Sequence, residues 1–197
     1  MQFVGDAEKL TADEIEQIAQ DFCIEPAALR AVIRVESSGS GFDAMGRPKI
    51  LFERHFFYRH LIDTPNLLAQ AEQLGIAYRR WGEKPYPKSS SGVYQELETA
   101  INIDEEAALL STSWGMGQIM GENFRLVDCK SVYEMVDEAK VSERNQIIQM
   151  CHYIHNTGLM DELQNHDWAG FARHYNGPQY TKNNYDTKLA DAYKEYA

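Results

Sequence analysis

The chain has 197 residues, of which 44% are hydrophobic and 25% are charged, a composition typical of a globular domain. Its formal net charge of −11 argues against nucleic acid and against anionic membrane surfaces as partners, because both need clustered lysine and arginine side chains. No segment approaches the roughly 18 apolar residues of a membrane span, and the first residues lack the basic and apolar regions of a signal peptide. We therefore expect one domain over residues 1–197, made in the cytoplasm and without a membrane anchor.

Capping residues predict helices in the first part of the chain. Thr11 and Glu14 form a capping-box pattern that opens a helix to about Phe22. Pro26 occupies the first position of a second helical segment, which runs to Glu36. The elements expected next are a strand over residues 49–53 in a small hairpin lobe, a helix over 65–74 and an exposed loop over 82–92.

The second half of the chain is predicted to be almost entirely helical. Ser131, Ser142 and Asp167 each have the side chain of a helix N-cap and each precede an apolar periodic segment. The expected helices cover residues 94–103, 104–110, 131 onward, 142–158, 167–177 and 186–193. The sequence thus predicts a mainly α domain with one small β-hairpin element.

The three cysteines show no paired spacing, so we expect reduced thiols and no disulfide framework. Cys23 and Cys151 lie in apolar helical surroundings and are expected in the core, whereas Cys129 has no catalytic histidine–cysteine pattern around it. His152 and His155 lie near Cys151, but neither a His-Glu-x-x-His nor a paired Cys-x-x-Cys pattern supports a metal. We expect no metal and no cofactor.

Glu36 ends an apolar helical stripe just before a segment rich in serine and glycine. Leu29, Val32, Ile33 and Glu36 follow the i, i+3, i+4, i+7 spacing and share one helix face. A carboxyl carried toward the core, near the negative end of a helix dipole, should hold its proton unusually well, as a general acid near neutral pH must. The alternative is an ordinary glutamate at a helix end with its carboxylate in water.

Three separated segments resemble motifs of the lysozyme-like superfamily. Glu36-Ser37 resembles the catalytic Glu-Ser of goose-type lysozymes and soluble lytic transglycosylases, residues 113–121 (SWGMGQIMG) resemble their Gly-Leu-Met-Gln-Ile segment, and residues 174–178 (HYNGP) resemble their Tyr-Asn-Ala-Gly-Pro segment without its alanine. With residues 46–55 (GRPKILFERH), the set looks like the N-acetylmuramidase domains of phage endolysins and some antibacterial effectors. The resemblance implies a lysozyme-like α+β fold, and no separate wall-binding domain is recognised.

This resemblance implies cleavage of the β-1,4 bond between N-acetylmuramic acid and N-acetylglucosamine in peptidoglycan. Glu36 would be the general acid. The residues implied to bind or orient the sugar chain are Ser37, Asp43, Trp114, Gly115, Gln118, Tyr175 and Asn176. Gly115 and Gly117 would let the backbone approach the sugar, and Trp114 would supply an aromatic face for stacking.

Hydrolysis usually requires a second carboxylate, either about 5 Å from the acid or about 6.5–9.5 Å away across a water molecule. We expect Glu53, on the predicted strand, in this role, with Asp43 as the other candidate; an ion pair of Glu53 with a neighbouring base is an equally good interpretation. If neither reaches the site, lytic transglycosylase chemistry giving 1,6-anhydromuramyl products is the alternative. A non-catalytic binding domain of lysozyme-like shape is the third hypothesis.

The acidic charge also bears on how the enzyme would reach its substrate. Peptidoglycan and lipopolysaccharide are anionic, so a domain of charge −11 gains no unspecific attraction to them. We therefore expect delivery to the periplasm by a holin or a secretion machine. We also expect a monomer, and an immunity protein if the chain is a bacterial effector.

Overall fold

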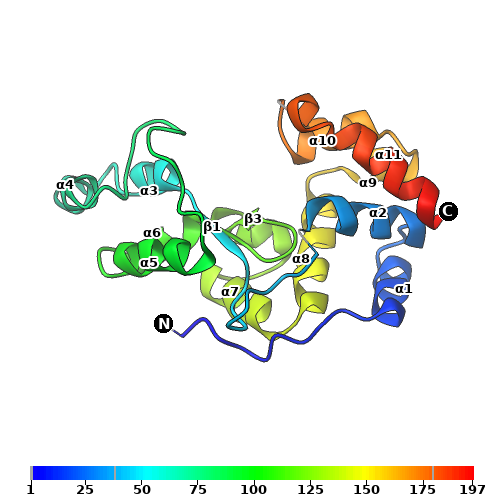
Figure 1. Ribbon diagram of the computed structural model, residues 1–197, viewed down its shortest axis with the longest axis horizontal. Helices are drawn as coiled ribbons and strands as arrows, with labels where there is room; N and C mark the ends of the chain where they lie inside the picture. Colours follow the sequence, from blue (N-terminus) through cyan, green and yellow to red (C-terminus); the bar gives the residue numbers. More distant parts are fainter. Residues whose placement is uncertain (1, 38, 179) are drawn as a thin grey trace.

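The computed structural model describes residues 2–37, 39–178 and 180–197 and confirms the mainly helical class with one small sheet (Figure 1). The α-helices are α1 (Ala12–Asp21), α2 (Pro26–Glu36), α3 (Arg54–His60), α4 (Pro65–Gln73), α5 (Ser90–Ile101), α6 (Glu105–Leu110), α7 (Val132–Val141), α8 (Glu143–Asn156), α9 (Met160–Gln164), α10 (Trp168–Tyr175) and α11 (Tyr185–Tyr196). Two 3-10 helices, η1 (Gly121–Val127) and η2 (Tyr180–Asn183), follow β3 and α10.

The sheet is antiparallel, with the strand order β1 (Ile50–Phe52), β2 (Thr112–Trp114) and β3 (Ile119–Met120). Ile50 pairs with Trp114, and Ser113 pairs with Met120. The expected strand over residues 49–53 is therefore present as β1. Strands β2 and β3 were not predicted, because segments of three and two residues are too short to display an alternating pattern.

Side-chain caps fix most helix starts where the sequence places them. Thr11 and Glu14 make both hydrogen bonds of the capping box, and Ser142 accepts from the backbone N–H of Asn145. Ser89 likewise caps α5 through the N–H of Gly92, so the predicted loop over 82–92 ends earlier than expected. Helix α3 was also not predicted, since its seven residues give only two turns of apolar periodicity.

The helices form two groups on either side of the sheet and α8. Figure 1 shows α1, α2, α9, α10 and α11 on one side, α3, α4 and α5 on the other, and α7 and α8 with the sheet between them. α11 packs against both α2 and α10. This packing brings the end of α2 close to residues more than 130 positions later in the chain.

The cysteines differ in part from the expectation. Cys129 and Cys151 are buried, but Cys23 is exposed, because it follows the last turn of α1 in a left-handed conformation with φ of 55°. All three are free thiols. Among the described residues, none of the helices has the length and apolar character needed to cross a bilayer.

Candidate active site

Glu36 is the last residue of α2, and its carboxylate is held by an amide from the far end of the chain. Asn176 Nδ2 donates to Glu36 Oε1 at 3.1 Å and to Oε2 at 2.9 Å. Burial raises the pKa of Glu36 to about 7, and it outweighs the Asn176 hydrogen bonds and the positive charge of Lys188, which both lower it. The group can therefore release or accept a proton near neutral pH.

Helix α10 carries Tyr175 and Asn176 of the HYNGP motif at its C-terminal end, and it directs their side chains to different partners. Asn176 is the C-cap of α10, and its backbone N–H donates to Ala172 O at 2.9 Å. The Tyr175 hydroxyl donates to Gly117 O at 3.0 Å and so connects α10 to the turn between β2 and β3. Among the hydrogen bonds that the structure describes, none joins this hydroxyl to the Glu36 carboxylate. Burial, together with the charge of Glu36, raises the pKa of Tyr175 well above its ordinary value.

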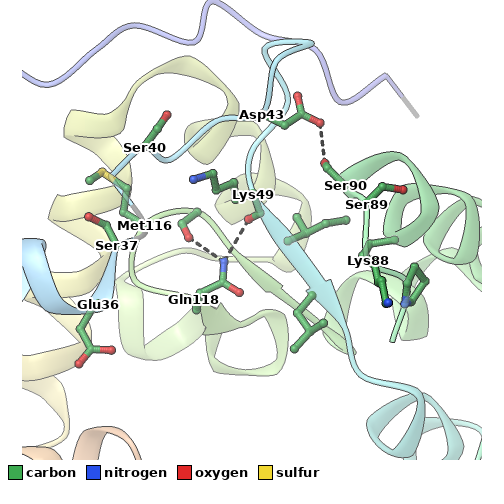
Figure 2. Close-up of a pocket in the computed structure, with 15 residues that line it drawn as sticks. Glu36, Ser37, Ser40, Asp43, Lys49, Lys88, Ser89, Ser90, Met116 and Gln118 are labelled. Atoms are coloured by element: carbon green, nitrogen blue, oxygen red, sulfur yellow. Dashed lines mark hydrogen bonds between the residues drawn. The ribbon is translucent and has the colours of Figure 1, made fainter. Parts of the chain in front are cut away.

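A cavity of about 380 Å³ extends from Glu36 along the sheet. Figure 2 shows Glu36 on one side of it, Gln118 in the middle and Lys88 on the far side. The expected site residues that line it are Glu36, Ser37, Asp43, Gly115 and Gln118. Three stretches distant in sequence, within residues 36–51, 87–93 and 115–118, therefore contribute to one cavity.

Gln118 closes the turn between β2 and β3 and presents its side chain to the cavity. Its Nε2 donates to Gly115 O at 2.8 Å and to Lys49 O at 3.2 Å, while its Oε1 accepts from Ser113 Oγ at 3.0 Å. The residue itself has φ of 47°, in the left-handed region. Gln118 therefore fixes the cavity wall as well as lining it.

The two glycines of the second motif make room for protein atoms. Gly115 has φ of 67°, and a Cβ there would lie 2.7 Å from the side chain of Gln146. At Gly117 a Cβ would lie 3.2 Å from both Met150 Cβ and the Tyr175 hydroxyl. On the Cβ side of both residues the space is filled by α8 and α10. Gly115 still lines the cavity, so the close approach of a sugar to its backbone stays a prediction.

Two other residues of the motifs have roles inside the protein. Trp114 is only 2% exposed, its Nε1 donates to Leu109 O at 3.2 Å, and its ring stacks on Phe3. It is a core residue and offers no open face to a sugar, contrary to the expectation. Ser37 lines the cavity, but its Oγ donates to Ile33 O at 2.6 Å at the end of α2.

The two candidate second carboxylates are both engaged. Asp43 lines the cavity and binds Arg47 Nε at 2.9 Å and Nη2 at 2.7 Å, and it accepts from Ser90 Oγ at 2.7 Å. Burial alone would raise the pKa of Asp43, but the Ser90 and Arg47 hydrogen bonds bring it below its ordinary value. Glu53 is not among the described residues of the cavity wall; it accepts from the Tyr86 hydroxyl and lies 3.2 Å from His55 Nδ1.

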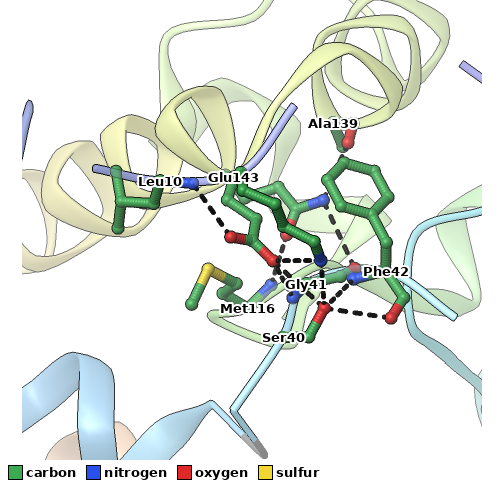
Figure 3. Close-up of polar contacts among 9 residues, drawn as sticks. Leu10, Ser40, Gly41, Phe42, Met116, Ala139 and Glu143 are labelled. Carbon is green, nitrogen blue, oxygen red and sulfur yellow. Dashed lines mark hydrogen bonds and ion pairs between the residues drawn. The ribbon is translucent and has the colours of Figure 1, made fainter. Parts of the chain in front are cut away.

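The carboxylate of Glu143, at the start of α8, holds the loop between Glu36 and Lys49 in place (Figure 3). Glu143 Oε1 accepts from Gly41 N at 2.9 Å, from Ser40 Oγ at 3.1 Å and from Lys9 Nζ at 2.9 Å. Its Oε2 accepts from Leu10 N at 3.0 Å. Glu143 therefore joins the N-terminal segment, α8 and the loop beside Glu36.

Comparison with known proteins agrees with this geometry. Residues 25–197 match the model of the N-acetylmuramidase family. The chain belongs to that family. The crystal structure of the Burkholderia AP3 phage endolysin is similar to the structure of this chain, with 36% sequence identity and a TM-score of 0.87. The match covers 97% of this chain and 72% of the endolysin chain. A comparison with curated proteins finds no match.

This N-acetylmuramidase domain is a peptidoglycan-degrading glycoside hydrolase with a lysozyme-like fold. Within the described part of the chain, no three histidine, cysteine, aspartate or glutamate side chains are grouped as a metal site would require. Sequence reasoning missed Lys188, whose charge acts on Glu36, and Lys49 and Lys88 in the cavity wall. No motif marks these lysines, since only the packing of distant segments brings them to the cavity.

Proposed function

We propose that Glu36 is the general acid that cleaves the β-1,4 bond between N-acetylmuramic acid and N-acetylglucosamine. The observation that carries this proposal is a half-buried carboxyl with a pKa of about 7 at the edge of a cavity. Family membership supports peptidoglycan as the substrate.

In the first step, protonated Glu36 gives its proton to the glycosidic oxygen as the bond to C1 of the muramic acid breaks. The sugar then carries an oxocarbenium-like positive charge, and Glu36 becomes a carboxylate. Asn176 stabilises that carboxylate through its two hydrogen bonds. Water adds at C1, and its released proton returns to a carboxylate.

The carboxylate that activates water is either Asp43 or Glu53. Asp43 lines the cavity, but Arg47 and Ser90 lower its pKa and so reduce its strength as a base. Glu53 has its oxygen engaged by Tyr86 and lies outside the described wall. In the first case Asp43→Asn removes activity, and in the second Glu53→Gln does.

Asp43 and Glu53 are both bound by other side chains of the protein, and this favours a second candidate function, lytic transglycosylase chemistry. Glu36 would then donate a proton to the leaving oxygen and next accept the proton of the muramic acid 6-hydroxyl as that oxygen bonds to C1. A pKa of about 7 suits a group that acts as acid and then as base. The products would carry 1,6-anhydro ends.

Purified peptidoglycan digested with wild type, Glu36→Gln, Glu53→Gln and Asp43→Asn tests these alternatives. We expect Glu36→Gln to lower the rate by about 10²–10⁴-fold, because the acid is removed. Glu98→Gln, at an exposed position on α5, is the matched control and should retain full activity.

Mass spectrometry of the released fragments distinguishes the reactions. Reducing muramic acid ends support hydrolysis, and only anhydro ends would overturn it in favour of the transglycosylase. Release by Glu36→Gln at the wild-type rate would remove Glu36 from the mechanism. No release by wild type would favour the binding-domain hypothesis.

We also propose that the enzyme reaches the periplasm through a holin or a secretion machine. The net charge of −11 supports this route, because it gives no attraction to anionic cell surfaces.

A further inference from the structure

The loop between α4 and α5 carries a tryptophan whose ring lies largely in water. Trp81 is 70% exposed, the highest value among the large apolar side chains that the structure describes, whereas Trp114 is 2% exposed. Gly82 follows with φ of 79°, and a Cβ there would meet no atom within 4 Å, so the chain projects into open space. A single exposed apolar side chain is ordinary, and its surroundings decide whether it has a role.

A chain of hydrogen bonds holds one edge of the Trp81 ring. The Tyr86 hydroxyl donates to Glu53 Oε2. Burial and this contact with Glu53 raise the pKa of Tyr86, while a side-chain hydrogen bond with Trp81 acts in the opposite direction. A hydrogen bond lowers the pKa of a phenol when it is donated to the phenol oxygen, and the indole N–H is a donor. Trp81 is therefore anchored through its N–H, with the rest of its ring in solvent.

The backbone of the same loop is fixed by a buried arginine. Arg54 is 4% exposed and pairs with Glu96 of α5 at 3.0 and 2.7 Å. Its guanidinium donates to Lys84 O at 2.9 Å and to Pro85 O at 3.2 Å, and its own carbonyl accepts from Tyr78 N at 3.4 Å. The loop is thus held on both sides of Trp81, so a ligand would not have to order it.

The charge of this loop is opposite to that of the whole chain. Residues 78–88, here called the 78–88 loop, carry four basic and one acidic side chain and so a net charge of +3, against −11 for the whole chain. The exposed basic residues are Arg79, Arg80, Lys84 and Lys88. Peptidoglycan is anionic, so the 78–88 loop is complementary to it in charge although the molecule as a whole is not.

The 78–88 loop continues directly into the cavity at Glu36. Pro87 and Lys88, at its end, line that cavity, and Figure 2 shows Lys88 on the side away from Glu36. Figure 1 shows the chain between α4 and α5 as a long loop that rises above the sheet. A glycan strand that leaves the cavity past Lys88 therefore meets the 78–88 loop next.

We propose that the 78–88 loop is a second binding surface for the glycan strand of peptidoglycan, with Trp81 stacking on a sugar ring outside the cavity. This inference rests on the proposed function, since it extends the path of a glycan cut at Glu36. A pyranose presents C–H groups on its faces, which pack on the apolar face of an indole. The basic side chains around Trp81 attract the carboxylates that the strand carries.

Kinetics on strands of two lengths tests this surface. The substrates are tetrasaccharides, which occupy the cavity alone, and long glycan strands, which extend past Lys88. On long strands Trp81→Ala should raise KM about fivefold with kcat unchanged, because a stacking contact outside the reacting bond is lost. On tetrasaccharides it should change neither constant.

Two variants serve as controls for the loss of the ring. Trp81→Phe keeps an aromatic face and should restore most of the affinity for long strands. Ile62→Ala removes another exposed apolar side chain, 55% exposed after the end of α3, and should leave both substrates unaffected. Thermal unfolding of Trp81→Ala should match wild type, since the ring is largely in solvent.

Binding without turnover separates this inference from the proposed function. Long strands added to Glu36→Gln should change the tryptophan fluorescence, and Glu36→Gln/Trp81→Ala should lose this change and bind about fivefold more weakly. An emission that long strands leave unchanged would overturn the stacking contact without any alteration of the loop. Retained cleavage by Glu36→Gln would contradict the proposed function alone, because the comparison of KM values does not use that variant.

The remaining contrary results concern the occupant of the surface. An equal rise in KM on tetrasaccharides and long strands would show that Trp81 acts on the cavity itself and would overturn the second surface. Long strands treated with an amidase lack their peptide stems but keep their sugar faces, so Trp81→Ala should weaken them as well. An effect confined to strands with stems would overturn the glycan as the occupant and assign the loop to the peptide.

Discussion

At the scale of single residues, the Glu36–Asn176 contact sets the pH range of the acid. Both amide hydrogen bonds go to carboxylate oxygens, so they stabilise the ionised form and lower the pKa that burial raises. A general acid works only while protonated, and activity is therefore lost as pH rises through that pKa. Lys188 acts in the same direction as Asn176.

Removal of the amide should move the alkaline limb of activity to higher pH. In Asn176→Ala the pKa of Glu36 rises further, and kcat should fall roughly tenfold because the carboxyl is less well oriented. The measurement is kcat/KM on peptidoglycan fragments between pH 5 and 9. Asn165→Ala, which changes the C-cap of α9, is the matched control and should leave the profile unchanged. An alkaline limb that stays in place or moves to lower pH would refute this account.

At the scale of elements, the side chain of Glu143 joins three segments of the chain through hydrogen bonds. Its side chain is 7% exposed and accepts from Lys9, Leu10, Ser40 and Gly41. Burial would raise the pKa of Glu143, but backbone hydrogen bonds from Leu10 and Gly41 bring it below its ordinary value of 4.5. A depressed folded-state pKa contributes stability above the unfolded pKa, and this stability is lost as pH falls through the folded value.

Glu143→Gln should therefore destabilise the fold by about 1–3 kcal/mol at pH 7, because one acceptor oxygen becomes a donor that faces backbone N–H groups. The check is thermal or denaturant unfolding at pH 7 and again below pH 4.5. The difference from wild type should shrink as pH falls from 4.5 through the lowered folded-state pKa of Glu143, because the wild-type carboxyl then also takes up a proton. A constant difference would contradict the linkage.

The elements also show where sequence patterns suffice. Caps at Thr11, Ser142 and Asp167 are local hydrogen bonds, so the side chain and its N–H partner lie within a few residues and can be predicted. Strand β2 exists only because β1 and β3 pair with it, and no local pattern encodes that pairing. The start of α5 was missed because three serines and Gly92 resemble a loop until Ser89 is seen to cap the helix.

The same division holds for the site. Glu36 could be recognised from its position on an apolar helix face and from the motif around it. The partner of Glu36, the burial of Trp114 and the packing of Gln146 against Gly115 depend on contacts between distant segments. Motif identity alone therefore does not separate residues that face the substrate from those that hold the cavity together.

At the scale of the whole molecule, the net charge of −11 should limit action from outside the cell. Purified protein should clear suspensions of isolated peptidoglycan, but it should leave intact Gram-negative cells turbid. Cells whose outer membrane has been permeabilised should lyse, because the barrier is then removed. Optical density over time measures all three. Rapid lysis of untreated cells would show that neither the charge nor the outer membrane restricts access.

The contact between Glu36 and Asn176 also makes the site discontinuous along the chain. A ribosome that has completed α8 has made the acid but not the amide that orients it. Gly158, at a tight turn with φ of 77° between α8 and α9, divides the chain into a fragment with the acid and a fragment with its partner. Two polypeptides separated at that turn should each lack activity, because neither holds both groups.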